Sequence, residues 1–151
     1  MAMVNEDAAA DAVWWDAWRG ILFANARVLH AVERDLEARA GLSIVFLDVL
    51  ARLYDAPGQR LRMQELQERT LFTFSGMTRL VDRIENAGLV RRERVPEDRR
   101  GVYVVLTPEG AHAYETAIVQ HRSDLQREFA SRLTSEQHQA VADALAQFWQ
   151  E

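Results

Sequence analysis

The chain has 151 residues, which suits one folded domain or two small lobes that share a core. Of these residues 48% are hydrophobic and 27% charged, which excludes a disordered chain or a membrane-spanning one. It contains no cysteine, which excludes disulfides, thiolate metal sites and thiol nucleophiles. The net charge is −5, which as a sum argues against a nucleic-acid partner. The acidic first residues do not resemble a secretory signal, so we expect a cytoplasmic protein.

A long first helix is predicted from residue 7 to residue 39, ending before Gly41. At about 1.5 Å per residue, such a helix is longer than the body of a small domain and needs a surface to pack against along its length. A second copy of the chain is the simplest candidate. The apolar seam of this helix consists of Trp14, Trp18, Ile21, Asn25, Val28, Val32 and Leu36.

Three shorter helices are predicted next. Ser43 is a plausible N-cap for a helix that runs through Tyr54, and Ala56-Pro57-Gly58 turns the chain. An extended piece over residues 60–62 leads into a helix over residues 63–70. Thr73 then caps a helix that runs to about Ala87 and ends at Gly88.

The helix that begins after Thr73 has two different faces. Its apolar face predicts contact with the core and carries Met77, Leu80, Val81, Ile84 and Ala87. Its polar face carries Ser75, Gly76, Thr78, Arg79, Asp82, Arg83 and Asn86. Arg79 and Arg83 are four residues apart, so both side chains project from the same side of the helix.

The hydrophobic period then changes to two, which predicts paired strands over residues 89–94 and 102–106 joined by a charged loop over residues 95–101. Thr107-Pro108-Glu109 predicts the start of a helix that runs to about Ser131. Thr134 and Gln137 fit a capping box for a last helix that reaches the C-terminus. The apolar face of that helix consists of Leu133, Val141, Leu145, Phe148 and Trp149.

The distribution of charge differs from its sum. All 18 basic residues are arginine, and ten of them lie with seven acids in residues 60–101, a net charge of +3. The remaining eight arginines and sixteen acids carry a net charge of −8. A basic middle between acidic ends is compatible with an anionic partner for that middle segment.

The order of these elements predicts a mainly α fold with a small β-hairpin wing, a winged helix-turn-helix. In that arrangement the second helix of the pair enters the DNA major groove and the hairpin reaches the flanking backbone or minor groove. Arg79 and Arg83 would reach guanine edges or phosphates, and Arg99 and Arg100 would enter the minor groove from the hairpin tip. Taken singly, a polar helix face or a charged hairpin turn could also be an ordinary solvent-exposed surface with no role in DNA binding.

The residues also resemble a known family. The run from Ser75 to Val90 is similar to the recognition-helix signature of MarR-family (multiple antibiotic resistance) regulators. Asp98-Arg99-Arg100-Gly101, with Leu106-Thr107-Pro108-Glu109-Gly110 after it, resembles their wing and the helix junction that follows. Leu42-Ser43 with Asp48-Val49-Leu50, and Leu61-Arg62-Met63 with Glu65-Leu66, match the two helices before the recognition helix. The resemblance covers roughly residues 10–150.

The resemblance implies roles for single residues. The positions that touch the major groove in the family correspond to Thr73, Ser75, Gly76, Thr78 and Arg79. Arg100 falls at the wing position that enters the minor groove, and Asp98 falls where a carboxylate holds that arginine by a salt bridge. The sequence departs from the family at Phe72 and Phe74, where polar residues are common. Phe72 fits a hydrophobic staple, and the role of Phe74 stays open.

The resemblance further implies a homodimer on a palindromic operator, as a single MarR-like domain over residues 1–151. Residues 12–40 and 108–151 would form the dimerisation helices, and residues 43–107 the DNA-binding lobe. The dimer interface is expected to include Trp14, Trp18, Ile21, Leu145, Phe148 and Trp149.

A regulatory ligand, small and aromatic or anionic, is a further implication, with Trp18, Arg27, His30 and Asp48 as the candidate binding residues. One branch of the family senses urate, and Trp18, Asp48, Arg79 and Arg91 or Arg92 could imitate its site. The alternatives are that Trp18 belongs to the dimer core and that Asp48 forms a salt bridge on a helix surface. These side chains therefore have two interpretations, an effector site or ordinary structural contacts.

Enzyme chemistry is not indicated. The four histidines, His30, His112, His121 and His138, have no metal-binding or nucleophile spacing, so no metal or cofactor is expected. The sequence therefore predicts a homodimeric, sequence-specific regulator that binds double-stranded DNA, a repressor released by a small molecule. The alternative is a winged-helix module whose basic face binds a protein and not DNA.

Overall fold

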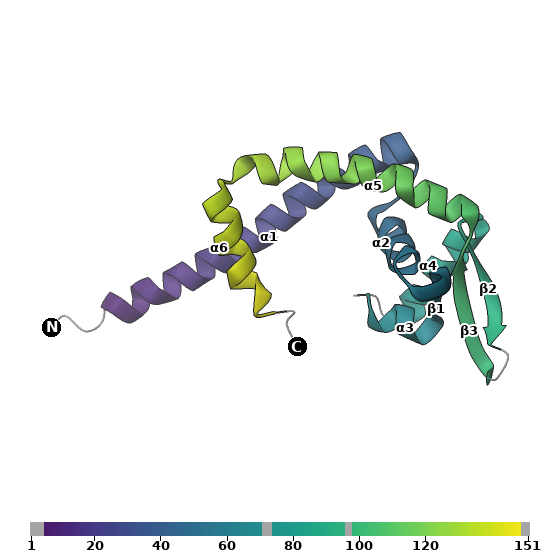
Figure 1. Ribbon diagram of the computed structural model, residues 1–151. Coiled ribbons are helices and arrows are strands. Elements are labelled where there is room, and N and C mark those ends of the chain that lie inside the picture. Colours follow the sequence, from purple (N-terminus) through teal and green to yellow (C-terminus); the bar gives the residue numbers. More distant parts are fainter. Residues whose placement is uncertain (1–4, 71–73, 96–97, 149–151) are drawn as a thin grey trace. The chain divides into compact units, whose positions relative to one another are not determined.

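The computed structural model describes residues 5–70, 74–95 and 98–148, with the backbone alone for residues 5–11, 74–75 and 99–100 (Figure 1). The chain is mostly helical with one three-stranded antiparallel sheet. The elements in order are α1 (Asn5–Ala40), α2 (Ile44–Tyr54), a 3₁₀ turn (Pro57–Gln59), β1 (Arg60–Arg62), α3 (Met63–Glu68), α4 (Phe74–Asn86), β2 (Val90–Val95), β3 (Asp98–Leu106), α5 (Pro108–Glu128), a 3₁₀ turn (Ala130–Arg132) and α6 (Ser135–Ala146).

The chain forms two compact units. One contains residues 35–123 and the other contains the chain up to Arg34 together with the chain from Asp124 onward. The end of α1 and most of α5 therefore belong to the same unit as the segment predicted as the DNA-binding lobe. Within the described residues, no helix is both long enough and apolar enough to cross a membrane.

The sheet has the strand order β1-β3-β2, with all pairs antiparallel. Leu61 of β1 and Arg92 of β2 both pair with Val104 of β3, so these three residues face the same side of the sheet. Leu61 and Val104 are buried in the core of this unit. That core is built from α2, α3, α4 and the sheet, with Leu36 from the end of α1 and Ala117 from α5.

The predicted start and stop signals are confirmed in several places. Ser43 caps α2 by accepting a hydrogen bond from the backbone N–H of Phe46 at 3.4 Å. Gly41 and Gly88 follow α1 and α4 with φ of +65° and +77°, which glycine adopts without steric cost. Thr134 and Gln137 form the predicted capping box of α6.

The predicted loop of the hairpin is wrong. Strand β2 runs on to Val95 and β3 begins at Asp98, and these two residues are paired across an irregular register after Arg94. Gly101 lies within β3 and not in a turn, at a point where neighbouring atoms leave no room for a side chain. A Cβ there would lie 2.8 Å from Asp98 Oδ2 and 2.8 Å from Val95 Cγ2.

Other differences are small and concern helix ends. Ala87 was predicted on the core face of α4, but the helix ends at Asn86 and Ala87 is exposed in the turn that follows. The predicted third and fifth helices are shorter than expected, because Arg69 already caps α3 and a 3₁₀ turn follows Glu128. Thr73, the predicted cap of α4, and Phe72 lie outside the described residues.

Helix α5 starts in direct contact with the turn before β2. Thr107 Oγ1 donates to Gly88 O at 2.8 Å and accepts from Gly110 N–H at 3.0 Å, which confirms the predicted helix start. A Cβ on Gly110 would lie 2.0 Å from the carbonyl oxygen of Leu89. Only a hydrogen at this position permits the backbones to approach so closely.

Gly110→Ala is therefore expected to lower the free energy of unfolding by about 1–3 kcal/mol, since backbone must move to admit the methyl group. The measurement is urea denaturation followed by circular dichroism. Gly20→Ala is the matched control, because a Cβ at Gly20 in α1 meets no atom within 4 Å apart from its chain neighbours and the backbone of its own helix. That control should be neutral or more stable by up to about 1 kcal/mol. A Gly110→Ala variant as stable as the parent would contradict the close approach.

Candidate nucleic-acid interface

Helix α4 presents the two faces that its sequence predicts. Met77, Val81 and Ile84 are fully buried and Leu80 nearly so, which confirms these four as core residues. On the other side Gly76, Arg79 and Arg83 are exposed and Thr78 is partly buried. The side chain of Ser75 and that of Phe74, the first residue of α4, are outside the description.

Arg79 and Arg83 differ in how they are held. The guanidinium of Arg83 lies over the ring of Phe46 from α2, 5.2 Å from its centroid. This cation–π contact restricts the Arg83 side chain and also ties α4 to α2. Arg79 forms no ion pair with a residue that the structure describes, because Asp82, one turn along, binds Arg92. Arg79 is therefore an exposed cation on α4 that remains available to an anionic partner.

One arginine of β2 connects the hairpin to α4. Arg92 Nη2 lies 2.7 Å from Asp82 Oδ1, and Arg92 Nη1 binds Glu85 Oε2. The backbone N–H of Arg92 also donates to Glu85 Oε1 at 2.8 Å, and its Nη2 donates to Thr78 O at 3.4 Å. The Arg92 side chain is only 25% exposed, so these contacts act with limited screening by water. They set the position of the hairpin relative to the polar face of α4.

A second arginine contacts the distal part of the hairpin. Arg62 Nη1, at the end of β1, lies 3.4 Å from Asp98 Oδ2 at the start of β3. Arg99 and Arg100 follow Asp98 in β3, and their side chains are outside the description. The expected salt bridge from Asp98 to Arg100 stays a prediction, while the contact from Asp98 to Arg62 is one that sequence reasoning missed.

Tyr103 of β3 lies beside Arg62 on the same face of the sheet. The guanidiniums of Arg60 and Arg62 lie 4.7 Å and 5.8 Å from the centroid of the Tyr103 ring. The hydrogen bond to Tyr103 raises the pKa of Arg62 above its ordinary value, the charges of Asp98 and Glu65 add to this, and partial desolvation opposes it. Arg62 therefore remains a cation next to Asp98 and the Tyr103 ring.

The candidate effector residues are divided between the two units. Trp18, Arg27 and His30 are exposed on α1 in one unit, and Asp48 lies on α2 in the other. Asp48 Oδ1 forms an ion pair with Arg52 Nη2 at 3.0 Å, which is the helix-surface salt bridge given above as its alternative role.

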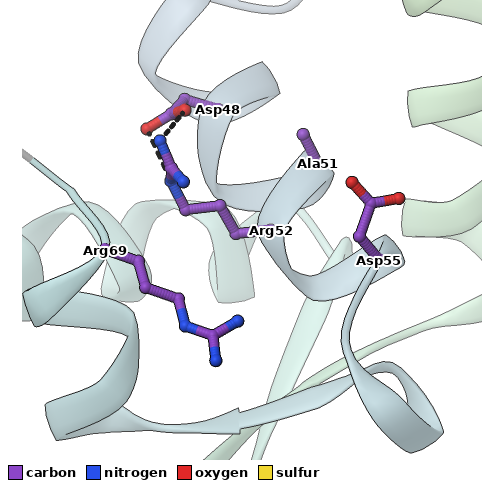
Figure 2. Close-up of a pocket in the computed structure, with 5 residues that line it drawn as sticks. All are labelled: Asp48, Ala51, Arg52, Asp55 and Arg69. Atoms are coloured by element: carbon purple, nitrogen blue, oxygen red, sulfur yellow. Dashed lines mark hydrogen bonds and ion pairs between the residues drawn. The ribbon is translucent and has the colours of Figure 1, made fainter. Parts of the chain in front are cut away.

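Asp48 also lines a pocket of about 350 Å³ within the unit of residues 35–123 (Figure 2). The pocket lies between α2 and the residue that follows α3, and its lining residues are Asp48, Ala51, Arg52, Asp55 and Arg69. Figure 2 shows the Arg69 guanidinium between α2 and the end of α3. The two acids and two arginines of this lining balance in charge, and its apolar side chain is the methyl group of Ala51.

Comparison with known proteins decides the family. A family model described as MarR family matches residues 40–101. The crystal structure of AbsC, a MarR family transcriptional regulator from Streptomyces coelicolor, is 34% identical, with 87% of this chain and 88% of that chain covered and a TM-score of 0.81. The chain belongs to the MarR family of transcriptional regulators.

Two further transcriptional regulators are similar. Sco3205 from Streptomyces coelicolor, solved in complex with DNA, is 31% identical, with 89% of this chain and 84% of that chain covered and a TM-score of 0.83. The HTH-type transcriptional repressor YetL from Bacillus subtilis (strain 168) is 32% identical over 104 residues, which span 69% of this chain and 62% of YetL. Both likenesses extend well beyond the segment that the family model matches.

Within this MarR-family fold, sequence reasoning missed the role of Arg92, which it considered only as an effector residue. A signal was present in the alternation of β2. Val90 is buried, so the second residue after it faces the helices too, and there Arg92 meets Asp82 and Glu85, which lie three residues apart on α4.

Arg92→Met is expected to lower the free energy of unfolding by about 1–3 kcal/mol, because it leaves two carboxylates of α4 without their cation. Arg91→Met is the matched control: the neighbouring Arg91 is 55% exposed and pairs with Glu93 on its own strand. That control should cost less than about 1 kcal/mol. The measurement is chemical denaturation of both variants, and equal losses would show that Arg92 has no special structural role.

Proposed function

We propose that this chain is a homodimeric, sequence-specific regulator that binds double-stranded DNA and represses transcription from a palindromic operator. The observation that carries the proposal is the exposed polar face of α4, which Arg92 joins to the hairpin of β2 and β3. The first residues of β3 include Arg99 and Arg100. A helix and a wing held at fixed separation suit the major groove and the flanking minor groove of one duplex.

The roles within the interface follow from exposure and chemistry. Gly76 and Thr78 near the start of α4 permit a close approach to base edges, together with Thr73 and Ser75 where the family makes such contacts. Arg79 supplies either a bidentate contact to guanine or a phosphate contact. Arg83, held over Phe46, supplies a positioned cation next to it.

The wing supplies the minor-groove contact. Arg100, with Arg99 beside it, enters the narrow and electronegative groove, and Asp98 supports that arginine. An arginine that is held before binding loses less conformational entropy on binding than a mobile one. Asp98 would therefore raise affinity without touching DNA.

Charge supports DNA as the partner despite the acidic total. Residues 60–101 carry a net charge of +3 within a chain of net charge −5. Attraction to phosphate is a local property of the surface that faces the duplex, and salt screens the rest of the molecule beyond about 8–10 Å. Acidic ends and a basic lobe also favour one orientation of approach.

The dimer is supported by the apolar side chains that α1 exposes. Trp14, Trp18 and Ile21 are 57%, 49% and 42% exposed. In α6 and after it, Leu145 is partly buried and Phe148 exposed, and Trp149 lies outside the described residues. Large apolar side chains in a row on one helix suggest an interface, and a twofold axis would present two copies of α4 to half-sites one helical turn apart.

Release by a small aromatic or anionic molecule is the regulatory part of the proposal, with Trp18, Arg27, His30 and Asp48 as its candidate residues. Such a molecule acts only if it binds the state that cannot engage DNA more tightly than the state that can. The salt bridge from Asp48 to Arg52 must then be exchanged for a ligand contact.

Arg79→Ala is expected to weaken binding to the cognate operator by about 1–3 kcal/mol. The measurement is fluorescence anisotropy with the inverted repeat nearest the gene and with a scrambled duplex, at several salt concentrations. Arg122→Ala removes the same charge from an exposed position on α5, which is part of neither α4 nor the hairpin, and should bind as the parent does.

The result separates the two functions considered. A loss for the cognate duplex alone assigns base reading to Arg79, and an equal loss for both duplexes assigns it a phosphate contact. A parent protein that binds both duplexes equally, or neither, would reject the regulator and favour the protein-binding module.

The double variant Trp18→Glu with Ile21→Glu is expected to yield monomers, because it places charges in the proposed apolar interface. The measurement is the molar mass from light scattering after size-exclusion chromatography. Phe23→Glu is the control, since Phe23 is 68% exposed and lies on a different side of α1. Dimers of unchanged stability in the double variant would exclude this face of α1 from the interface.

A further inference from the structure

The part of the hairpin that includes residues 98–102 of β3 has little support from the rest of the sheet. Strand β1 pairs only with Tyr103, Val104 and Val105 of β3, so β3 before Tyr103 has β2 as its one strand neighbour among the described residues. An isolated two-stranded hairpin is only marginally stable in water. The segment that carries Arg99 and Arg100 therefore needs a further contact to keep its direction.

Arg62 supplies a contact from outside the hairpin. Its side chain reaches Asp98 across 36 positions of sequence, with Nη1 at 3.4 Å from Oδ2. Its backbone is fixed at the junction of β1 and α3, because its N–H donates to Glu65 Oε2 at 2.7 Å. The Tyr103 ring beside the guanidinium limits the rotamers that the side chain can adopt.

The hairpin leaves room for the Asp98 carboxylate at Gly101. A Cβ at position 101 would lie 2.8 Å from Asp98 Oδ2. Glycine has no Cβ, so it leaves room for the Asp98 carboxylate. A carboxylate accepts several hydrogen bonds, so a contact with Arg62 is compatible with one to a wing arginine. The carboxylate is thus placed between the body of the lobe and the residues that follow it in β3.

We propose that Arg62 is the positioning residue of the wing: it holds Asp98, and through Asp98 it sets the direction of the arginine-bearing segment before DNA is bound. The effect on DNA binding rests on the proposed function. The contact by which Arg62 holds Asp98 does not depend on DNA.

Arg60 provides a matched control for Arg62. It belongs to the same strand, carries the same charge and lies over the same Tyr103 ring, but it forms no ion pair with a residue that the structure describes. Replacing either arginine by methionine removes one positive charge from one face of the sheet. Only the change at Arg62 removes the contact with Asp98.

The first experiment uses no DNA. Amide hydrogen exchange over residues 98–102 is compared in the full-length parent, Arg62→Met, Arg62→Lys, Arg60→Met and Asp98→Asn. Exchange is expected to be about two- to fivefold faster in Arg62→Met and in Asp98→Asn, as for the loss of a half-exposed ion pair. Arg60→Met should match the parent, and Arg62→Lys should be partly rescued, because lysine still offers a cation to Asp98.

The second experiment measures operator affinity in a double-mutant cycle of Arg62→Met and Asp98→Asn. The double variant is expected to bind as weakly as the worse single variant, since both changes break the same contact. Losses that multiply would overturn the proposal, as would equal exchange in Arg62→Met and Arg60→Met. If the parent does not bind DNA, the proposed function fails, and the exchange data alone still decide whether Arg62 holds the wing.

Discussion

The interaction between Arg92 and the two acids of α4 is the constraint on which the interface depends. A DNA-binding surface made from a helix and a hairpin needs the two held at a separation that suits neighbouring grooves of one duplex. One guanidinium meets Asp82, Glu85 and the carbonyl of Thr78, and the Arg92 backbone adds a fourth bond. The same acids would repel phosphate if they were free, so this contact also removes two unfavourable charges from the side of α4 that DNA would approach.

Much of the fold could be predicted from the sequence because its signals are local. Ser43, Gly41, Gly88 and the pair of Thr134 and Gln137 act within one helical turn, and all four mark the ends where the structure has them. The period of α4 also identified four of its core residues, since a helix in contact with a core must repeat every three to four positions. Ala87 failed because the helix had already ended.

The contacts that organise the interface could not be predicted in the same way, because each joins residues that are distant in sequence. Arg62 and Asp98 are 36 positions apart, and Arg83 meets Phe46 from another helix. Gly101 was misinterpreted for a related reason: glycine indicates either a turn or a crowded backbone, and only the neighbours distinguish them. Composition identified the basic segment, but it could not show which of its arginines form ion pairs with acidic residues.

The contact of Gly110 with Leu89 has a mechanical consequence. At Gly110, helix α5 meets the carbonyl oxygen of Leu89 at the root of the hairpin with no side chain of its own between the two backbones, and the Thr107 hydroxyl next to it bonds Gly88 O. The same helix continues past residue 123 into the other compact unit. Because the two backbones are in contact, a displacement of the first turn of α5 would have to displace the start of β2 as well. A position without a side chain thus joins the helix to the strand.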